Sequence, residues 1–241
     1  MSTKQERARY DLITGFYLGV VGSDASDPSA ATLLGLLGGV RGMRVLDLAC
    51  GHGRITRELA RRGGRVSGVD ISEKLLELAR DAEAAQPLGI TYSRCDITSD
   101  HALRGETFDV ISCNQGLADI DDLDGALHTV SRLLRRGGRF VFSILHPCFP
   151  GWDQDAPSSW PPHGGYHAEG WWLASNPGIR GKVGANHRML STYLNTLRRH
   201  HLTIERTAEP RPGPTLLARQ RTAQPDAGPP PMFLVVACRK V

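Results

Sequence analysis

Short apolar runs alternate with amphipathic stretches along the chain from about residue 43 to residue 145. Each run leads into a turn rich in glycine or polar residues, which favours a strand. The stretches between them carry apolar residues three and four positions apart, as in Leu123, Ala126, Leu127 and Val130, which predicts amphipathic helices. Strands alternating with helices are typical of a doubly wound α/β domain with a parallel sheet. The expected strands begin at Val45 and cover residues 66–70, 90–94, 108–113 and 139–145.

The pattern breaks between residues 146 and 186, which hold all four tryptophans together with many prolines and glycines. A second irregular stretch, residues 208–231, is rich in Pro, Gly and Arg, a composition typical of mobile segments. The remaining expected elements are helices near residues 5–20, 28–37 and 190–197 and strands at 202–206 and 232–238.

The most informative segment is the glycine-rich turn after the first expected strand. Gly51 and Gly53 follow that strand, and Asp70 ends the next one, an arrangement that can hold a dinucleotide or S-adenosylmethionine. A dinucleotide fingerprint needs a third glycine, where this chain has Thr56. Asp47 lies four residues before the turn, where a carboxylate would repel a pyrophosphate and attract the ammonium group of S-adenosylmethionine. The residues therefore favour S-adenosylmethionine.

With these residues the chain resembles the class I S-adenosylmethionine-dependent methyltransferases. The resemblance extends from about Met43 to Leu145, is looser from His187 onward, and is absent between these parts. It implies a doubly wound, Rossmann-like seven-stranded sheet with helices on both faces and an antiparallel last strand. The tryptophan-rich stretch then forms an aromatic-rich insertion after strand five. The segments that carry it are Asp47 to Gly53, Asp70, Cys95-Asp96-Ile97, residues 108–113 and residues 133–142.

The resemblance also suggests how one domain, residues 1–241, is organised. Residues 1–40 are expected to form an N-terminal helical lid, and residues 41–145 the cofactor-binding core. Residues 146–187 are expected to form an acceptor cap, and residues 188–241 the C-terminal helix and strands. The tryptophans of the cap could form apolar walls for an aromatic acceptor or could simply pack the insertion onto the sheet.

The resemblance assigns cofactor contacts to single residues. Asp47 is expected to accept from the ammonium group, Asp70 from the ribose hydroxyls and Asp96 from the adenine amino group. Asp70 could instead start a helix, and Asp96 could be a turn residue. Ile71 would lie against the adenine, and Ile97 would donate a backbone N–H to it. The other expected contacts are Tyr17 from the lid, Ala49, Gly51 and Gly53 in the turn, and Asn114, Gln115 and Leu117 near the methionine end.

Methyl transfer needs alignment, exclusion of water and, for many acceptors, removal of one proton. A histidine can remove a proton near neutral pH. His146 directly follows the fifth expected strand, and His187 precedes the next helix, so these are the candidate catalytic residues. A purely structural role is the alternative for each.

Several acceptor classes are disfavoured by particular residues. The sequence Asn114-Gln115-Gly116-Leu117 departs from the motif of nucleobase amino-methyltransferases, and no glutamate pair follows strand four as in protein-arginine methyltransferases. No cysteine and histidine cluster has metal-ligand spacing, so no metal is expected. A small organic molecule, methylated on O, N, C or S, remains by elimination.

Composition changes this interpretation little. The 241 residues carry a net charge of +4, and basic residues occur in ones and twos, so no nucleic-acid partner is expected. Five scattered cysteines and the absence of a long apolar run favour a cytoplasmic protein without a membrane span. A homodimer is left open. The rival hypotheses are a non-catalytic S-adenosylmethionine-binding or regulatory protein and a nicotinamide-dependent oxidoreductase.

Overall fold

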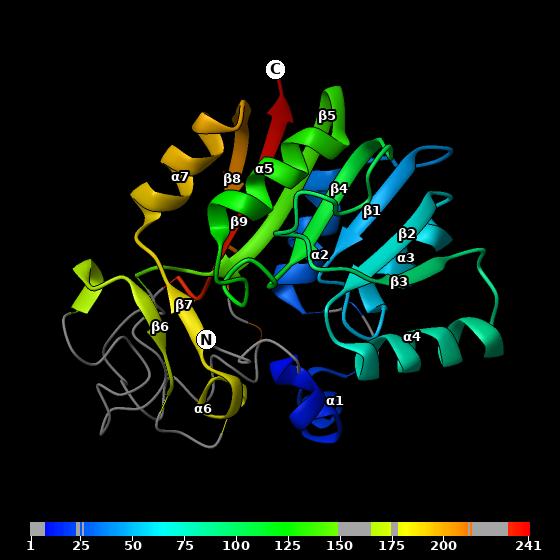
Figure 1. Cartoon of the computed structure of the whole chain (residues 1–241), viewed down its shortest axis with the longest axis horizontal. Helices are drawn as coiled ribbons and strands as arrows, with labels where there is room; N and C mark the ends of the chain where they lie inside the picture. The colour runs from blue at the N-terminus through cyan, green and yellow to red at the C-terminus, as the bar shows by residue number, and fades with distance from the viewer. Residues whose placement is uncertain are drawn as a thin grey trace.

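The computed structural model describes residues 8–22, 25, 27–148, 165–174, 178–211, 213 and 231–241. In this part of the chain, one seven-stranded sheet runs between helices that lie on both of its faces (Figure 1). The strand order is β3-β2-β1-β4-β5-β9-β8. The strands are β1 (Arg44–Leu48), β2 (Arg65–Asp70), β3 (Thr91–Arg94), β4 (Phe108–Asn114), β5 (Leu134–Leu145), β8 (Leu202–Ala208) and β9 (Phe233–Lys240).

The strand directions confirm the predicted topology. Strands β1 to β5 pair in parallel, whereas β9 runs antiparallel to both β5 and β8. Strand β1 lies between β2 and β4, so the chain order reverses there. In an open α/β sheet, ligands bind outside the carboxyl ends of the strands at such a switch point. The glycine-rich turn leaves β1 at this place.

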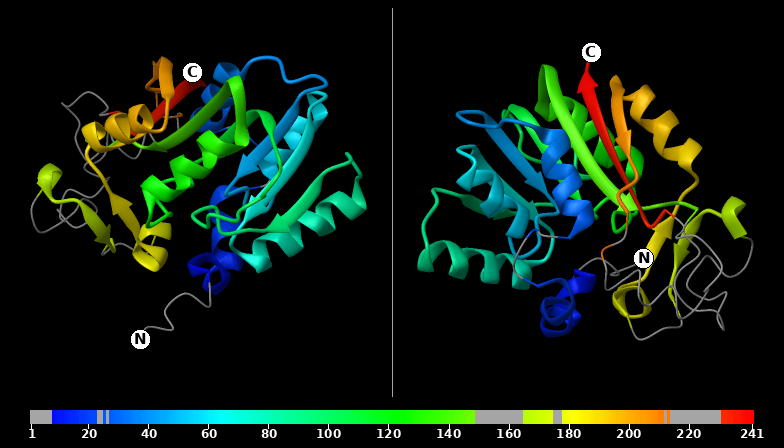
Figure 2. Two further views of the ribbon diagram at one scale, coloured as in Figure 1. Left: turned by 45° about the horizontal axis from the view of Figure 1, so that its top comes forward. Right: turned by 180° about the vertical axis from the view of Figure 1, so that it is seen from behind.

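The helices form two layers because each central strand buries side chains on both faces. Leu46 and Leu48 pack with α5 and α7, whereas Val45 packs with α2 and α3 on the opposite face. Figure 2 shows the two layers from two further directions. The helices that precede the cap are η1 (Arg9–Leu12), α1 (Thr14–Val21), α2 (Pro28–Leu37), α3 (Arg54–Arg61), α4 (Glu73–Ala85) and α5 (Leu123–Leu133); α7 (Leu190–Arg199) follows it.

Local capping explains where several helices begin. Asp27 caps α2 by accepting from the N–H of Ala30 at 3.0 Å, and Pro28 fills the first position, which lacks a helical donor anyway. Ser72 caps α4 as its sequence position predicts. The expected helix at residues 5–20 is divided, because Ile13 leaves the helical conformation between η1 and α1.

Two further parts of the structure differ from the expected elements. Strand β5 begins at Leu134 rather than Arg139, because Leu134 already pairs with Phe108 before the register becomes irregular. The segment expected to form the acceptor cap, called the cap below, contains a second small sheet of β6 (Gly170–Trp172) and β7 (Ala185–His187), with α6 (Ile179–Val183) between them in the chain. Such short strands leave no periodic signal in the sequence. Trp152, Trp160 and most of residues 208–231 lie outside the described residues.

Candidate functional site

The glycine-rich turn bends back sharply from β1 into α3. Ala49, Gly51 and Gly53 have φ of 53°, 56° and 86°, the left-handed region that glycine adopts at little cost. At Gly53 a Cβ atom would also lie 2.4 Å from the hydroxyl of Tyr92, too close for any side chain. The backbone N–H of Cys50 donates to the carbonyl of Val69 on β2 at 3.0 Å, which fixes the turn against the neighbouring strand.

Asp47 lies beneath this turn with a side chain that is almost wholly buried. One carboxylate oxygen accepts from the hydroxyl of Thr56 at 2.6 Å, and the other accepts from the hydroxyl of Ser112 at 2.7 Å. Burial raises the pKa of Asp47 to about 6, although the two hydroxyl groups act in the opposite direction. Thr56 therefore holds the carboxylate in place, which a third glycine at this position could not do.

Asp70 connects the end of β2 to the same turn. Its carboxylate accepts from the N–H of Gly51 at 2.8 Å and from the N–H of Ser72 at 2.9 Å. Burial raises the pKa of Asp70, and these two backbone donors lower it. The sequence alternative that Asp70 starts a helix is thus part of the structure, because the carboxylate also orders the N-cap residue of α4.

A hollow of about 280 Å³, open solvent included, lies beside the turn. The ring of Tyr17 on α1 covers one side of it and lies edge-on to the ring of His52, with 5.7 Å between the ring centres. Burial raises the pKa of Tyr17 to about 12, so its phenol is neutral. The residues that line the hollow are Tyr17, Asp47, Ala49, Cys50, His52, Arg54, Ile55 and Asn114.

His52 and Arg54 line this hollow although neither was singled out in the sequence. The Nε2 atom of His52 lies 2.8 Å from the carbonyl oxygen of Gly22, so it carries the proton. Burial lowers the pKa of His52, which keeps the ring neutral and makes Nδ1 an acceptor. Nδ1 is buried and has no hydrogen-bond partner among the described residues. Arg54, at the start of α3, pairs with Asp27 at 2.5 Å. A histidine between two glycines and an arginine directly after them were the signals available.

The end of β4 also lines the hollow. Asn114 reaches the hollow, and its side-chain oxygen accepts from the hydroxyl of Ser143 at 2.8 Å. Gln115 has φ of 61° and donates from its side chain to Ser29 and Ser143, so its amide is directed toward α2 and β5. Leu117 is fully buried in the core, so only its backbone could contact a ligand.

A Cβ at Gly116 would lie only 2.5 Å from the Cβ of Ala49. The close approach of these two backbones explains why the β4 end can meet the glycine-rich turn. A larger residue at position 116 would push the two loops apart.

The expected adenine side is formed by residues after β2 and β3. Ile71 has 39% of its surface exposed, and its apolar side chain there suits a platform for a flat ring. One oxygen of Asp96 accepts from both the N–H and the hydroxyl of Thr98, at 2.9 and 2.7 Å, which makes Asp96 a turn residue. Its second oxygen has no such bond to another described residue. Ile97 places its side chain in the core.

The two candidate catalytic histidines are buried and do not line the hollow. Nδ1 of His146 accepts from the N–H of Cys148 at 3.1 Å, and Nε2 lies 3.0 Å from a carboxylate oxygen of Glu209. Nε2 of His187 donates to the carbonyl of Tyr166 at 2.9 Å. Each ring therefore ties chain segments together, and a catalytic role for either stays a prediction.

The described part of the cap places its two tryptophans on β6. Trp171 is 54% exposed and lies so close to Gly184 that a Cβ there would be 2.5 Å from the indole ring. Packing of the insertion against itself thus accounts for one face of Trp171. No group of His, Cys, Asp or Glu in the described chain is arranged to hold a metal ion. No described helix is both long and apolar enough to cross a membrane.

Comparisons with known proteins point to one family. A model described as a methyltransferase domain matches residues 46–142. The ubiquinone biosynthesis O-methyltransferase of Alkalilimnicola ehrlichii is 33% identical over 110 residues, which cover 46% of this chain and 44% of that protein. The match thus spans less than half of the length of this curated relative.

Two solved structures extend the comparison to most of the chain. The S-adenosylmethionine-dependent methyltransferase from Mesorhizobium loti is 33% identical, with a TM-score of 0.70, over 89% of this chain and 98% of that one. The 1,6-didemethyltoxoflavin-N1-methyltransferase from Burkholderia thailandensis is 20% identical, with a TM-score of 0.64, over 97% of this chain and 87% of that one. The second likeness concerns the fold alone.

Proposed function

This chain belongs to the S-adenosylmethionine-dependent methyltransferases, and we propose that it transfers a methyl group from this cofactor to a small organic molecule. The observation that carries the proposal is the hollow at the glycine-rich turn, which has the Asp47 carboxylate in its wall at the carboxyl edge of β1. S-Adenosylmethionine supplies a methyl group that is already activated by its sulfonium centre. The protein must then bind, orient and exclude water.

The donors and acceptors of the hollow fit the amino-acid end of the cofactor. Asp47 gives an anion for the ammonium group. His52, a lining residue whose buried Nδ1 has no partner among the described residues, gives a neutral acceptor. An orphaned buried acceptor is costly unless a ligand satisfies it. Arg54 gives a cation for the carboxylate, and Asn114 gives an amide. We propose that these four residues, together with the backbone of Ala49, hold the methionine end.

The nucleoside end is assigned to the residues after β2 and β3. Asp70 would take the ribose hydroxyls with lone pairs beyond those used by Gly51 and Ser72, since each carboxylate oxygen can accept more than once. The exposed side chain of Ile71 would lie against the adenine. The second oxygen of Asp96 and the N–H of Ile97 would meet its edge. Gly51 and Gly53 would permit the close approach of the cofactor to the backbone. Gln115 and Leu117 would contribute by fixing the loop after β4.

The acceptor is proposed to enter under the cap and lid. Tyr17 covers the cofactor from the lid, and the cap begins after β5, where the methyl group would be delivered. His146 and His187 remain the proposed bases for an acceptor that must lose a proton. For His146 this requires release of the Cys148 N–H, which now occupies Nδ1.

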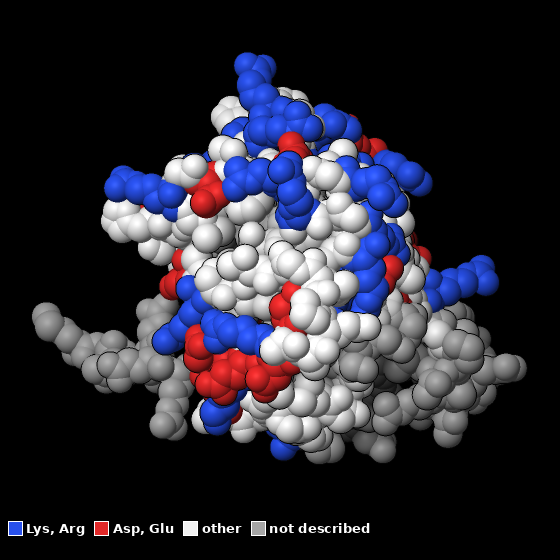
Figure 3. All heavy atoms as spheres, turned by 90° about the vertical axis from the view of Figure 1, so that its right-hand side faces the viewer, with Lys and Arg blue, Asp and Glu red and all other residues white. Residues whose placement is uncertain are grey.

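Charge and cysteine state support the remaining parts of the proposal. On the face shown in Figure 3, Lys and Arg groups are interrupted by neutral and acidic side chains, which does not favour a nucleic-acid partner. All five cysteines are free thiols, which suits the reducing cytoplasm. A homodimer is compatible with this proposal but is not required by it.

The proposal is tested by incubating the protein with methyl-labelled S-adenosylmethionine and a panel of small phenols, carboxylic acids, amines, thiols and activated carbon acids. Labelled product from at least one class, lost in Asp70→Ala, is the expected result. Cofactor binding without transfer to any class would instead favour the non-catalytic alternative. Binding of a nicotinamide dinucleotide in place of S-adenosylhomocysteine would overturn the proposal.

A further inference from the structure

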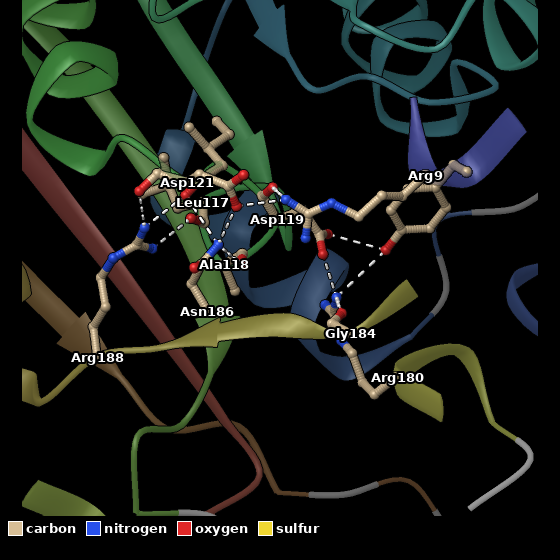
Figure 4. A network of polar contacts seen from close by, with 11 residues as sticks. Arg9, Leu117, Ala118, Asp119, Asp121, Arg180, Gly184, Asn186 and Arg188 are labelled. Carbon is tan, nitrogen blue, oxygen red and sulfur yellow. Dashed lines mark hydrogen bonds and ion pairs between the residues drawn. The ribbon is translucent and has the colours of Figure 1, made fainter. Parts of the chain in front are cut away.

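The loop between β4 and α5 is held by two segments that are distant in sequence (Figure 4). One is the described part of the cap, which contributes Arg180 and β7. The other is the start of the lid, which contributes Arg9 and Tyr10. Both segments meet at the side chain of Asp119 in the loop (Figure 4).

Most hydrogen bonds from the cap to the loop are accepted by backbone carbonyl groups of the loop. The N–H of Asn186 donates to the carbonyl of Ala118 at 2.7 Å. Arg188 donates to the carbonyl of Leu117 at 3.0 Å and to that of Asp121 at 2.8 Å. These bonds hold the backbone of the loop whatever its side chains are. The side chain of Asn186 on β7 also donates to the carboxylate of Asp121 at 2.9 Å. Among the described residues, α6 has one side-chain contact with the loop.

That contact is the ion pair between Arg180 and Asp119. Nη1 of Arg180 donates to a carboxylate oxygen of Asp119 and also to the carbonyl of Gly184 at 3.0 Å. The side chains are only 16% and 21% exposed, so the pair is poorly screened by solvent. Neutralising Asp119 would leave a buried guanidinium without its carboxylate.

The lid uses the other oxygen of the same carboxylate. The hydroxyl of Tyr10 donates to it at 3.0 Å, and Arg9 donates to the backbone carbonyl of Asp119 at 3.3 Å. Arg9 also pairs with the carboxylate of Asp121 at 2.5 Å. The ring of Tyr10 lies edge-on to the ring of Tyr17, with 5.2 Å between centres. Tyr17 in turn lies over the glycine-rich turn, its hydroxyl 3.6 Å from where a Cβ of Gly51 would be. A continuous line of contacts thus runs from Asp119 to the wall of the hollow.

We propose that Asp119 is a positioning residue that fastens the lid and the cap to the β4–α5 loop at once, and so controls how long the cofactor product stays bound. The inference rests on the proposed function, because it takes the hollow to be the cofactor site. One carboxylate with two partners makes the closures interdependent. Asp121 also meets both segments, through Arg9 and Asn186, but its side chain is 73% exposed and solvent weakens its contacts, whereas that of Asp119 is 21% exposed. If the carboxylate is neutralised, both segments loosen; if one partner is removed, the other segment keeps its tie.

The first test uses the ligand-free protein and amide hydrogen exchange. Asp119→Asn is expected to speed exchange in both residues 9–21 and residues 179–187. Tyr10→Phe is expected to speed it chiefly in residues 9–21, and because it removes one hydroxyl and strands no charge, it should fold even if Asp119→Asn does not. Asp124→Asn is the matched control, since that half-exposed carboxylate on α5 contacts Arg199 and His200 at the end of α7. Faster exchange in only one segment of Asp119→Asn would overturn the interdependence.

The second test measures S-adenosylhomocysteine dissociation by stopped flow. Loss of a hydrogen bond to a charged group predicts dissociation about tenfold faster or more in Asp119→Asn, with Asp124→Asn unchanged. Adding Tyr10→Phe to Asp119→Asn should give no further increase, because the phenol has already lost its carboxylate partner. An unchanged rate in both Asp119→Asn and Tyr10→Phe would contradict the inference. Absence of binding in the parent would instead contradict the proposed function. The exchange experiment would still show whether Asp119 holds both the lid and the cap.

Discussion

The carboxylate of Asp70 accepts a hydrogen bond from the backbone N–H of Gly51 at 2.8 Å. This bond joins the end of β2 to the glycine-rich turn after β1, so the proposed ribose acid also shapes the loop that the cofactor approaches. On the proposed function, Asp70 acts on binding in two ways, by direct contact with the ribose and by the position of the turn. Variants at Asp70 need a folding control beside every binding measurement.

The contact between Gly116 and Ala49 gives a steric prediction. Gly116→Ala would place a Cβ 2.5 Å from the Cβ of Ala49, so one loop must shift. We expect a loss of about 1–3 kcal/mol in the free energy of unfolding and weaker S-adenosylhomocysteine binding. Urea unfolding and calorimetry measure the two effects.

Gly35→Ala is the matched control, because a Cβ at Gly35 in α2 meets nothing within 4 Å. Alanine there should raise stability by about 0.5–1 kcal/mol through helix propensity. Equal behaviour of the two variants would show that the two loops do not depend on their close approach.

The raised pKa of Asp47 predicts how stability depends on pH. Because burial raises the pKa to about 6, the folded protein holds this proton more tightly than the unfolded chain does. The contribution of this group to the free energy of unfolding is therefore greatest below pH 4 and falls as the pH rises to about 6. Asp47→Asn lacks this dependence, so the stability of the variant relative to the parent should improve by up to about 3 kcal/mol between pH 4 and pH 7. Urea unfolding across this range checks it, and a difference that does not vary with pH would contradict it.

The same carboxyl group predicts the pH dependence of binding. An ammonium group is attracted to the ionised form of Asp47 alone, and a pKa of about 6 leaves about a tenfold smaller ionised fraction at pH 5 than at pH 7. S-Adenosylhomocysteine affinity should fall by a similar factor in the parent and stay nearly constant in Asp47→Asn. Titrations at both pH values measure this. An equal fall in the two proteins would place the ammonium group away from Asp47.

The unpartnered Nδ1 of His52 gives a prediction about single atoms. His52→Gln can still donate to the carbonyl of Gly22 but has no acceptor at the Nδ1 position, whereas His52→Asn can place its amide oxygen near that position. A hydrogen bond to a charged donor predicts binding weaker by about tenfold or more in His52→Gln and a smaller loss in His52→Asn. Calorimetry at pH 7.5 compares them. The reverse order would show that the Gly22 bond, rather than Nδ1, matters for binding.

Much of the fold could be predicted because its signals are local. Strands buried on both faces give apolar runs, such as the one from Val45 to Leu48, and Ser72 marks the start of α4 by its capping hydroxyl. The glycine-rich turn and its acids could be located for the same reason. The hydrogen bonds of Asp47 with Thr56 and Ser112, and of Asp70 with Ser72, could not be predicted from the sequence pattern.

What could not be predicted depends on contacts between distant residues. The role of His52 follows from a carbonyl 30 residues earlier, and Asp119 meets Tyr10 and Arg180 across 109 and 61 residues. His146 and His187 were singled out by their place after strands, but their ring nitrogens are engaged by Cys148, Glu209 and the Tyr166 carbonyl. Their positions in the chain place His146 and His187 after strands, as predicted, but do not reveal these hydrogen-bond partners.

The central claim is that the hollow beside Gly51 and Asp70 binds S-adenosylmethionine, and calorimetric titration with S-adenosylhomocysteine tests it most directly. The parent and Asp70→Ala are compared, with Asp124→Asn as a folded control. Saturation at about 100 times the dissociation constant should also stabilise the parent by about 2.7 kcal/mol. We expect micromolar binding in the parent and the control, and its loss in an Asp70→Ala protein that remains folded. No heat and no stabilisation in the parent, or unchanged binding in Asp70→Ala, would contradict the account.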